Sequence, residues 1–106
     1  MNDLKALYVI VNSGFSSEIV DIARGCGSKG ATILNARGSV VNPKTILGIT
    51  IDTEKEIVLT IAEKETAVKI MQEVKEKAGI GTPAHALSFF VPVEMSTLNT
   101  EDGVEE

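Results

Sequence analysis

The apolar residues of this chain recur with two spacings, one typical of strands and one typical of helices. Short runs of apolar and β-branched residues, bounded by glycine, proline, asparagine or serine, indicate strands. Four such runs occur, at residues 6–12 (ALYVIVN), 31–36 (ATILNA), 56–62 (EIVLTIA) and 87–93 (LSFFVPV). Apolar residues three or four positions apart indicate amphipathic helices. This spacing occurs twice, after an N-cap at Ser16 or Ser17 and over residues 65–77.

The order of these elements, β-α-β-β-α-β, predicts the fold class. Two right-handed strand–helix–strand crossovers produce a ferredoxin-like α+β sandwich, a four-stranded antiparallel sheet with both helices on one face. The 106 residues suffice for one such domain, which we assign to residues 1–97. Residues 98–106 form an acidic tail ending in NTEDGVEE, which we expect to be disordered.

The segment between the second and third strands is predicted to be a long loop. Residues 37–45 (RGSVVNPKT) contain glycine, asparagine and proline, which favour turns. The following run, residues 46–52 (ILGITID), could form a short hairpin arm before the third strand.

The predicted strands are apolar on both faces. In the first strand Leu7, Val9 and Val11 point one way, and Ala6, Tyr8 and Ile10 point the other. The third and last strands alternate in the same manner. Two helices on one face leave the second apolar face uncovered, so we expect subunits to associate through it.

Composition and charge narrow the class of protein. With 43% hydrophobic and 24% charged residues the chain is an ordinary globular protein, and it has no apolar run long enough to span a membrane. The net charge of -5 argues against nucleic-acid binding. A single cysteine, Cys26, excludes an internal disulfide and fits a cytoplasmic setting.

Few residues suggest catalysis. No acid–base pair and no cluster with metal-ligand spacing is present, so we expect neither an enzyme nor a metal site. The turn at residues 13–16 (SGFS) could hold an anion on its N–H groups. It lacks the arginine that acylphosphatases of this fold need there, since the first arginine is Arg24.

Two short motifs resemble those of a known family. The second strand ends in Ala36-Arg37-Gly38, and residues 79–94 read GIGTPAHALSFFVPVE. Together with the topology, over about residues 4–95, they resemble the PII-type nitrogen regulatory proteins. That resemblance implies a cytoplasmic homotrimeric sensor without catalytic activity. It further implies an adenine nucleotide (ATP, ADP or AMP) bound between subunits, and a long loop that docks on a membrane transporter or an enzyme.

The resemblance also assigns candidate site residues. The ligand would contact the base of the long loop and a second loop, residues 79–86, at Arg37, Gly38, Ser39, Gly81, Thr82, Ala84 and His85. The partner protein would contact the tip of the long loop, at Val40, Val41, Asn42 and Lys44.

The chain departs from the family's pattern in the second loop. The family has a glycine-aspartate-glycine-lysine pattern there, whose lysine contacts phosphate, whereas residues 82–85 read TPAH. The long loop lacks the tyrosine that is uridylylated, because the only tyrosine is Tyr8, and the family's C-terminal arginine is absent. His85 is either a polar turn residue or a contact to a ligand's phosphate or carboxylate. The alternative function is a CutA-like trimer, linked to divalent-cation tolerance, whose metal binding would depend on His85.

Overall fold

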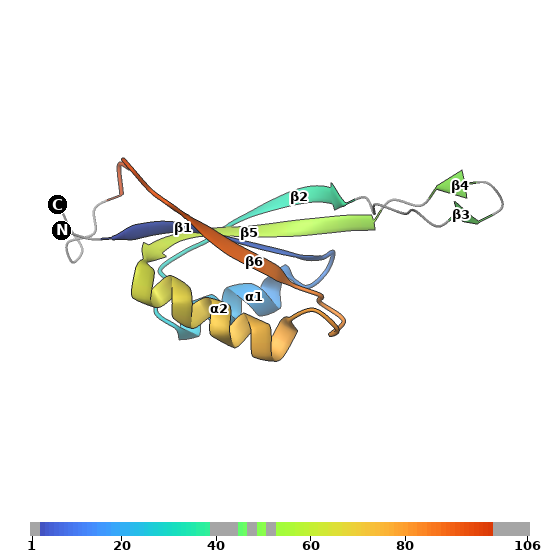
Figure 1. Ribbon diagram of the computed structural model, residues 1–106, viewed down its shortest axis with the longest axis horizontal. Coiled ribbons are helices and arrows are strands. Elements are labelled where there is room, and N and C mark those ends of the chain that lie inside the picture. The colour runs from blue at the N-terminus through green and yellow to red at the C-terminus, as the bar shows by residue number, and fades with distance from the viewer. Residues whose placement is uncertain (1–2, 39–44, 47–48, 51–52, 99–106) are drawn as a thin grey trace.

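The computed structural model describes residues 3–38, 45–46, 49–50 and 53–98 of the chain. Six strands and two helices follow one another along these residues (Figure 1). They are β1 (Leu4–Asn12), α1 (Ser16–Gly25), β2 (Thr32–Gly38), β3 (Thr45–Ile46), β4 (Ile49–Thr50), β5 (Thr53–Glu63), α2 (Lys64–Ala78) and β6 (Leu87–Pro92). Of the predicted C-terminal tail, residues 99–106 lie outside the described residues.

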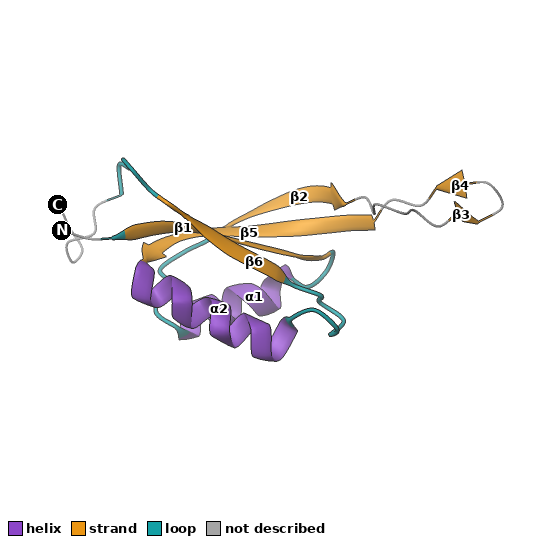
Figure 2. Ribbon diagram, in the orientation of Figure 1, coloured by secondary structure: helices purple, strands orange, loops and turns teal. Residues whose placement is uncertain are grey.

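The four long strands form one antiparallel sheet in the order β2-β5-β1-β6. Both helices lie on the same face of this sheet, as Figure 2 shows. The ferredoxin-like sandwich predicted from the element order is therefore confirmed. The short strands β3 and β4 pair with each other as a separate hairpin, beyond the end of the sheet (Figure 1).

Strands β2 and β5 run further toward the long loop than the sequence pattern predicts. The apolar pattern ends the second strand at residue 36 and begins the third at residue 56, whereas the motif Ala36-Arg37-Gly38 places the end of the second strand at residue 38. In the structure Arg37 pairs with Glu54, and Gly38 pairs with Thr53. The backbone ladder continues through these polar residues because hydrogen bonding between strands does not require apolar side chains. Arg37 and Gly38 are thus the last residues of a strand.

The core lies between the sheet and the two helices. From the sheet, the fully buried side chains are those of Leu7, Val9, Val11 and Val58. From the helices, Ile19, Ile70 and Val74 pack against them. These residues are the inward halves of the alternating and helical patterns in the sequence, and the structure shows which half of each strand pattern faces the helices.

The other face of the sheet, which we call the open face, carries large apolar side chains that the single chain leaves exposed. The rings of Tyr8 and Phe89, neighbours in the register of β1 and β6, stack with their centroids 5.1 Å apart. Five apolar residues on this face are between 38% and 54% exposed: Leu34, Ile61, Leu87, Phe89 and Val91. A face of this composition is typical of a surface that another protein chain covers.

Helix α2 ends where a glycine is required by close packing. A Cβ on Gly79 would lie 2.5 Å from the backbone oxygen of Lys75, a contact that real Cβ atoms do not make. Neither backbone segment can move away easily, because Lys75 lies within α2 and the Gly79 position is buried. Glycine at residue 79 therefore allows the backbone to pass close to the last turn of α2 as it enters the second loop.

We expect Gly79→Ala to lower the free energy of unfolding by about 1–3 kcal/mol, the usual cost of forcing an extra methyl into a packed site. The matched control is Gly30→Ala, since a Cβ at Gly30 meets nothing within 4 Å. That variant should stay within about 0.5 kcal/mol of the wild type. Urea denaturation of both variants makes the comparison, and equal effects would contradict the role of close packing at Gly79.

Candidate functional site

Three segments that are far apart in sequence meet at one end of the sheet. They are the end of β1, the paired ends of β2 and β5 that lead to the long loop, and the second loop (residues 79–86). The Asn12 N–H donates to the carbonyl of Ala84 at 2.9 Å, and the Ser13 N–H donates to the carbonyl of Glu54 at 3.2 Å. The end of β1 thus joins the second loop to the strand end that lies beside the base of the long loop.

The side chain of Asn12 connects the second loop to β5. Its oxygen Oδ1 accepts a hydrogen bond from Lys55 Nζ at 2.7 Å. Its Nδ2 donates to the carbonyl of Pro83 at 2.9 Å. One amide therefore holds the beginning of β5 and the middle of the second loop in a fixed relation.

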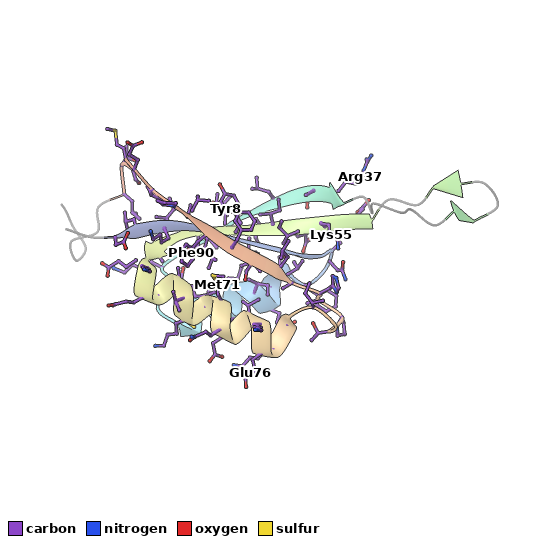
Figure 3. The ribbon with its side chains drawn as sticks, viewed as in Figure 1. Tyr8, Arg37, Lys55, Met71, Glu76 and Phe90 are labelled. Atoms are coloured by element: carbon purple, nitrogen blue, oxygen red, sulfur yellow. The ribbon has the colours of Figure 1, made fainter. Side chains whose placement is uncertain are left out.

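Gly38 makes room for the Lys55 side chain. A Cβ at Gly38 would approach Lys55 Cε to 3.1 Å and Lys55 Cγ to 3.3 Å. Lys55 is half-buried, whereas Arg37 is exposed. In Figure 3 both cations lie at the end of the sheet from which β2 and β5 lead to the long loop.

Neither Asn12 nor Lys55 was identified from the sequence. Asn12 marks only the polar end of an apolar strand, and Lys55 stands in the charged stretch TEKE. They are register partners across β1 and β5. Knowledge of the register between β1 and β5 would have identified this pair. The hydrophobic pattern does not determine that register to the residue.

The second loop is braced by its own hydrogen bonds. The N–H and the hydroxyl of Thr82 both donate to the carbonyl of Gly79, at 3.0 and 2.7 Å. The hydroxyl oxygen of Thr82 accepts from the His85 N–H at 3.3 Å. Ala84 is buried and belongs to the core cluster, so it anchors the loop.

His85 is exposed and has a backbone conformation that is rare outside glycine, with φ of 52°. Its Nδ1 accepts a long hydrogen bond, 3.4 Å, from the N–H of Gly81. The imidazole therefore takes part in the turn while remaining open to solvent. This geometry agrees with both interpretations of His85, as a turn residue and as a ligand contact.

The predicted anion-binding turn before α1 is already filled by a carboxylate of this chain. Glu56 Oε1 accepts hydrogen bonds from the N–H groups of Gly14 and Ser16, at 3.1 and 3.2 Å. The predicted serine N-cap is wrong, because the N-cap residue is Phe15 and no side-chain cap bond forms there. Glu56 of β5 satisfies the free N–H groups of the helix start instead.

Several predicted site residues cannot be placed. Those outside the described residues are Ser39, Val40, Val41, Asn42 and Lys44. Within the described part of the chain, no three His, Cys, Asp or Glu side chains converge into a group that could hold a metal ion. Cys26 is half-buried and packs against the core cluster.

Comparison with known proteins identifies the fold. No protein-family model matches the sequence, and a search of curated protein sequences finds no match. Among solved structures, one similar chain is a Thermus thermophilus protein described as PII-like and signalling, with 22% identity, 97% of each chain covered and a TM-score of 0.72.

Two solved structures of B. subtilis GlnK are also similar. The first has 12% identity, covers 96% of this chain and 94% of that one, and has a TM-score of 0.71. The second, a complex with ATP, has 14% identity and a TM-score of 0.72. The match covers 96% of this chain and 93% of the GlnK chain. At these identities the likeness establishes the fold, and this chain has the fold of the PII-like signalling proteins. No helix among the described residues is long and apolar enough to cross a membrane.

We expect Glu56→Gln to lower the melting temperature at pH 7 and to lose this effect in acid. Hydrogen bonds from Ser16, and from the backbone of Gly14, hold the pKa of the Glu56 carboxyl below its ordinary value. A lowered pKa stabilises the folded state above the unfolded-state pKa of about 4.3, and the stabilisation is lost as pH falls through the folded-state pKa.

Melting temperatures measured from pH 3 to pH 7 test this prediction. The difference in melting temperature between wild type and Glu56→Gln should become smaller toward pH 3. The exposed control Glu76→Gln should melt close to wild type at every pH. A gap of constant size would mean that the charge of Glu56 is not what stabilises the start of α1.

Proposed function

We propose that this protein is a cytoplasmic, homotrimeric PII-like signalling protein of the nitrogen-regulation type. It binds a small anionic effector, an adenine nucleotide, between subunits, and regulates a membrane transporter or an enzyme through its long loop. It acts as a sensor and catalyses no reaction. The observation that carries this proposal is that Asn12 joins the second loop to β5, the strand paired with the base of the long loop, within a PII-like fold.

The open face supports the trimer. Burial of a large apolar side chain contributes roughly 1.5–3 kcal/mol, so covering the five exposed residues of this face outweighs the small gain available from surface ion pairs. The Tyr8–Phe89 stack is already ordered in the single chain, which lowers the entropy lost on association.

The effector site is supported by the chemistry of its loops. A solved B. subtilis GlnK complex of the same fold contains ATP. In this chain, Arg37 presents a planar guanidinium that can bind phosphate oxygens in pairs. The exposed imidazole of His85 lies on the second loop, which Asn12 ties to β5, the strand paired with Arg37.

The same site would transmit the signal. An effector that bridges Arg37 and His85 connects the last residues of β2 to a braced loop on the protein body. The long loop continues from Gly38, so effector binding changes the base from which it extends toward a partner. The CutA-like alternative has no specific observation in its favour among the described residues.

We expect Phe89→Glu to convert the trimer into monomers, because three buried carboxylates would face apolar surface. Light scattering of the wild type should give a mass three times the chain mass of 11.3 kDa. The variant should give the mass of a single chain. The matched control is Met95→Glu, which changes a methionine that is 90% exposed, outside the strands and outside the second loop, and should remain trimeric. A wild-type protein that is monomeric contradicts the proposal.

We expect the wild-type trimer to bind ATP, ADP or AMP, and Arg37→Ala and His85→Ala to weaken that binding about tenfold or more each. A charge-assisted hydrogen bond contributes about 1.5–3 kcal/mol. Calorimetric titration measures the affinities. The control Arg24→Ala removes an exposed arginine at the end of α1, paired with Asp21, and should leave them unchanged. A trimer that binds none of the three nucleotides overturns the effector assignment.

A further inference from the structure

Lys55 is a half-buried cation that is held by a neutral group. Its Nζ donates to the amide oxygen of Asn12 at 2.7 Å. Ion pairs among the described residues join Lys5 to Asp3, Arg24 to Asp21, and Lys77 to Glu73, and none of these includes Lys55. An ammonium favours an anionic neighbour, and the amide oxygen of Asn12 does not supply a negative charge.

The surroundings of Lys55 hold its ammonium in one place. Its stem lies against the backbone of Gly38, where any side chain at residue 38 would crowd it. Asn12 fixes the ammonium and is itself held by its bond to the Pro83 carbonyl and by the backbone bond to Ala84. A lysine on a flexible stem is thereby oriented before any ligand arrives, which reduces the entropy lost on binding.

The position of Lys55 is also between the two loops of the proposed effector site. It follows directly on Glu54, the partner of Arg37 in the sheet, and it reaches the second loop through Asn12. An ammonium has three N–H donors, and Asn12 accepts one of them. Two donors are thus available to oxygen atoms of a molecule bound at this end of the sheet.

We propose that Lys55 binds a phosphate group of the effector, with Asn12 as its positioning residue. This inference rests on the proposed nucleotide function and adds the residue that recognises the phosphate charge. Chemically, the site selects a phosphorylated ligand because an oxyanion supplies the negative partner that a half-buried cation favours. The second loop contributes no lysine of its own to such a contact.

The experiment compares wild type, Lys55→Gln, Lys55→Met and the control Lys64→Gln. Lys64 is an exposed lysine next to the opposite end of β5, so its variant loses the same charge far from the site. Each protein is first shown by light scattering and melting to have the wild-type mass and a folded transition. Dissociation constants for ATP are then measured, together with displacement of ATP by inorganic tripolyphosphate.

We expect both Lys55 variants to bind ATP about 10- to 100-fold more weakly, and the control to bind as the wild type does. Tripolyphosphate should displace ATP from wild type and lose potency against the Lys55 variants. Unchanged ATP affinity in Lys55→Gln overturns the assignment of Lys55 and leaves the nucleotide function standing. If the Lys55 variants bind ATP more weakly but tripolyphosphate displaces ATP from them as well as from wild type, the assignment of Lys55 is also overturned. Lys55 would then only position the loops. A wild-type trimer that binds no nucleotide removes both proposals together.

Discussion

One constraint governs the whole molecule: a four-stranded sheet that is apolar on both faces has only two helices to cover it. The helices bury Leu7, Val9 and Val11 on one side, which leaves Phe89 and Leu87 exposed on the other. Exposure of this face to water is unfavourable, so covering it would contribute to the free energy of the association that we propose. The proposed ligand site lies at the ends of the strands, where the loops meet.

At that end of the sheet, polar side chains hold the segments together as apolar packing does elsewhere. Asn12 ties the second loop to β5. Glu56, one residue after Lys55, fills the N–H groups before α1 and so removes a competing anion site. The two neighbours on β5 point to opposite faces of the sheet. The carboxylate of Glu56 therefore occupies the anion-binding turn before α1. The ammonium of Lys55, on the other face of the sheet, remains accessible to the ligand that we propose.

The sequence predicted the fold class and the two alternating sets of each strand, but not which set forms the core, nor the pair of Asn12 and Lys55. Periodicity is a local signal, and it separated Val9 from Tyr8 and placed both helices correctly. The pairing of Asn12 with Lys55 depends on the register between strands 43 residues apart, which no local pattern encodes. The prediction of a serine N-cap for α1 was wrong for the same reason. A serine was available locally, but the carboxylate of Glu56, distant in sequence, accepts the hydrogen bonds at the helix start. Ala84 packs in the core cluster, which the sequence did not indicate, and its contact with a ligand stays a prediction.

The length of β5 has a mechanical consequence. The strand runs for eleven residues without a break from Thr53 to Glu63, and α2 begins at the very next residue. It is paired with β1 on one side and with β2 on the other. A slip by one residue would turn Val58 outward and Ile57 inward, so the strand has no neighbouring register to move into. The pairing on both sides therefore holds β5 in one register along its whole length, up to the helix that follows it.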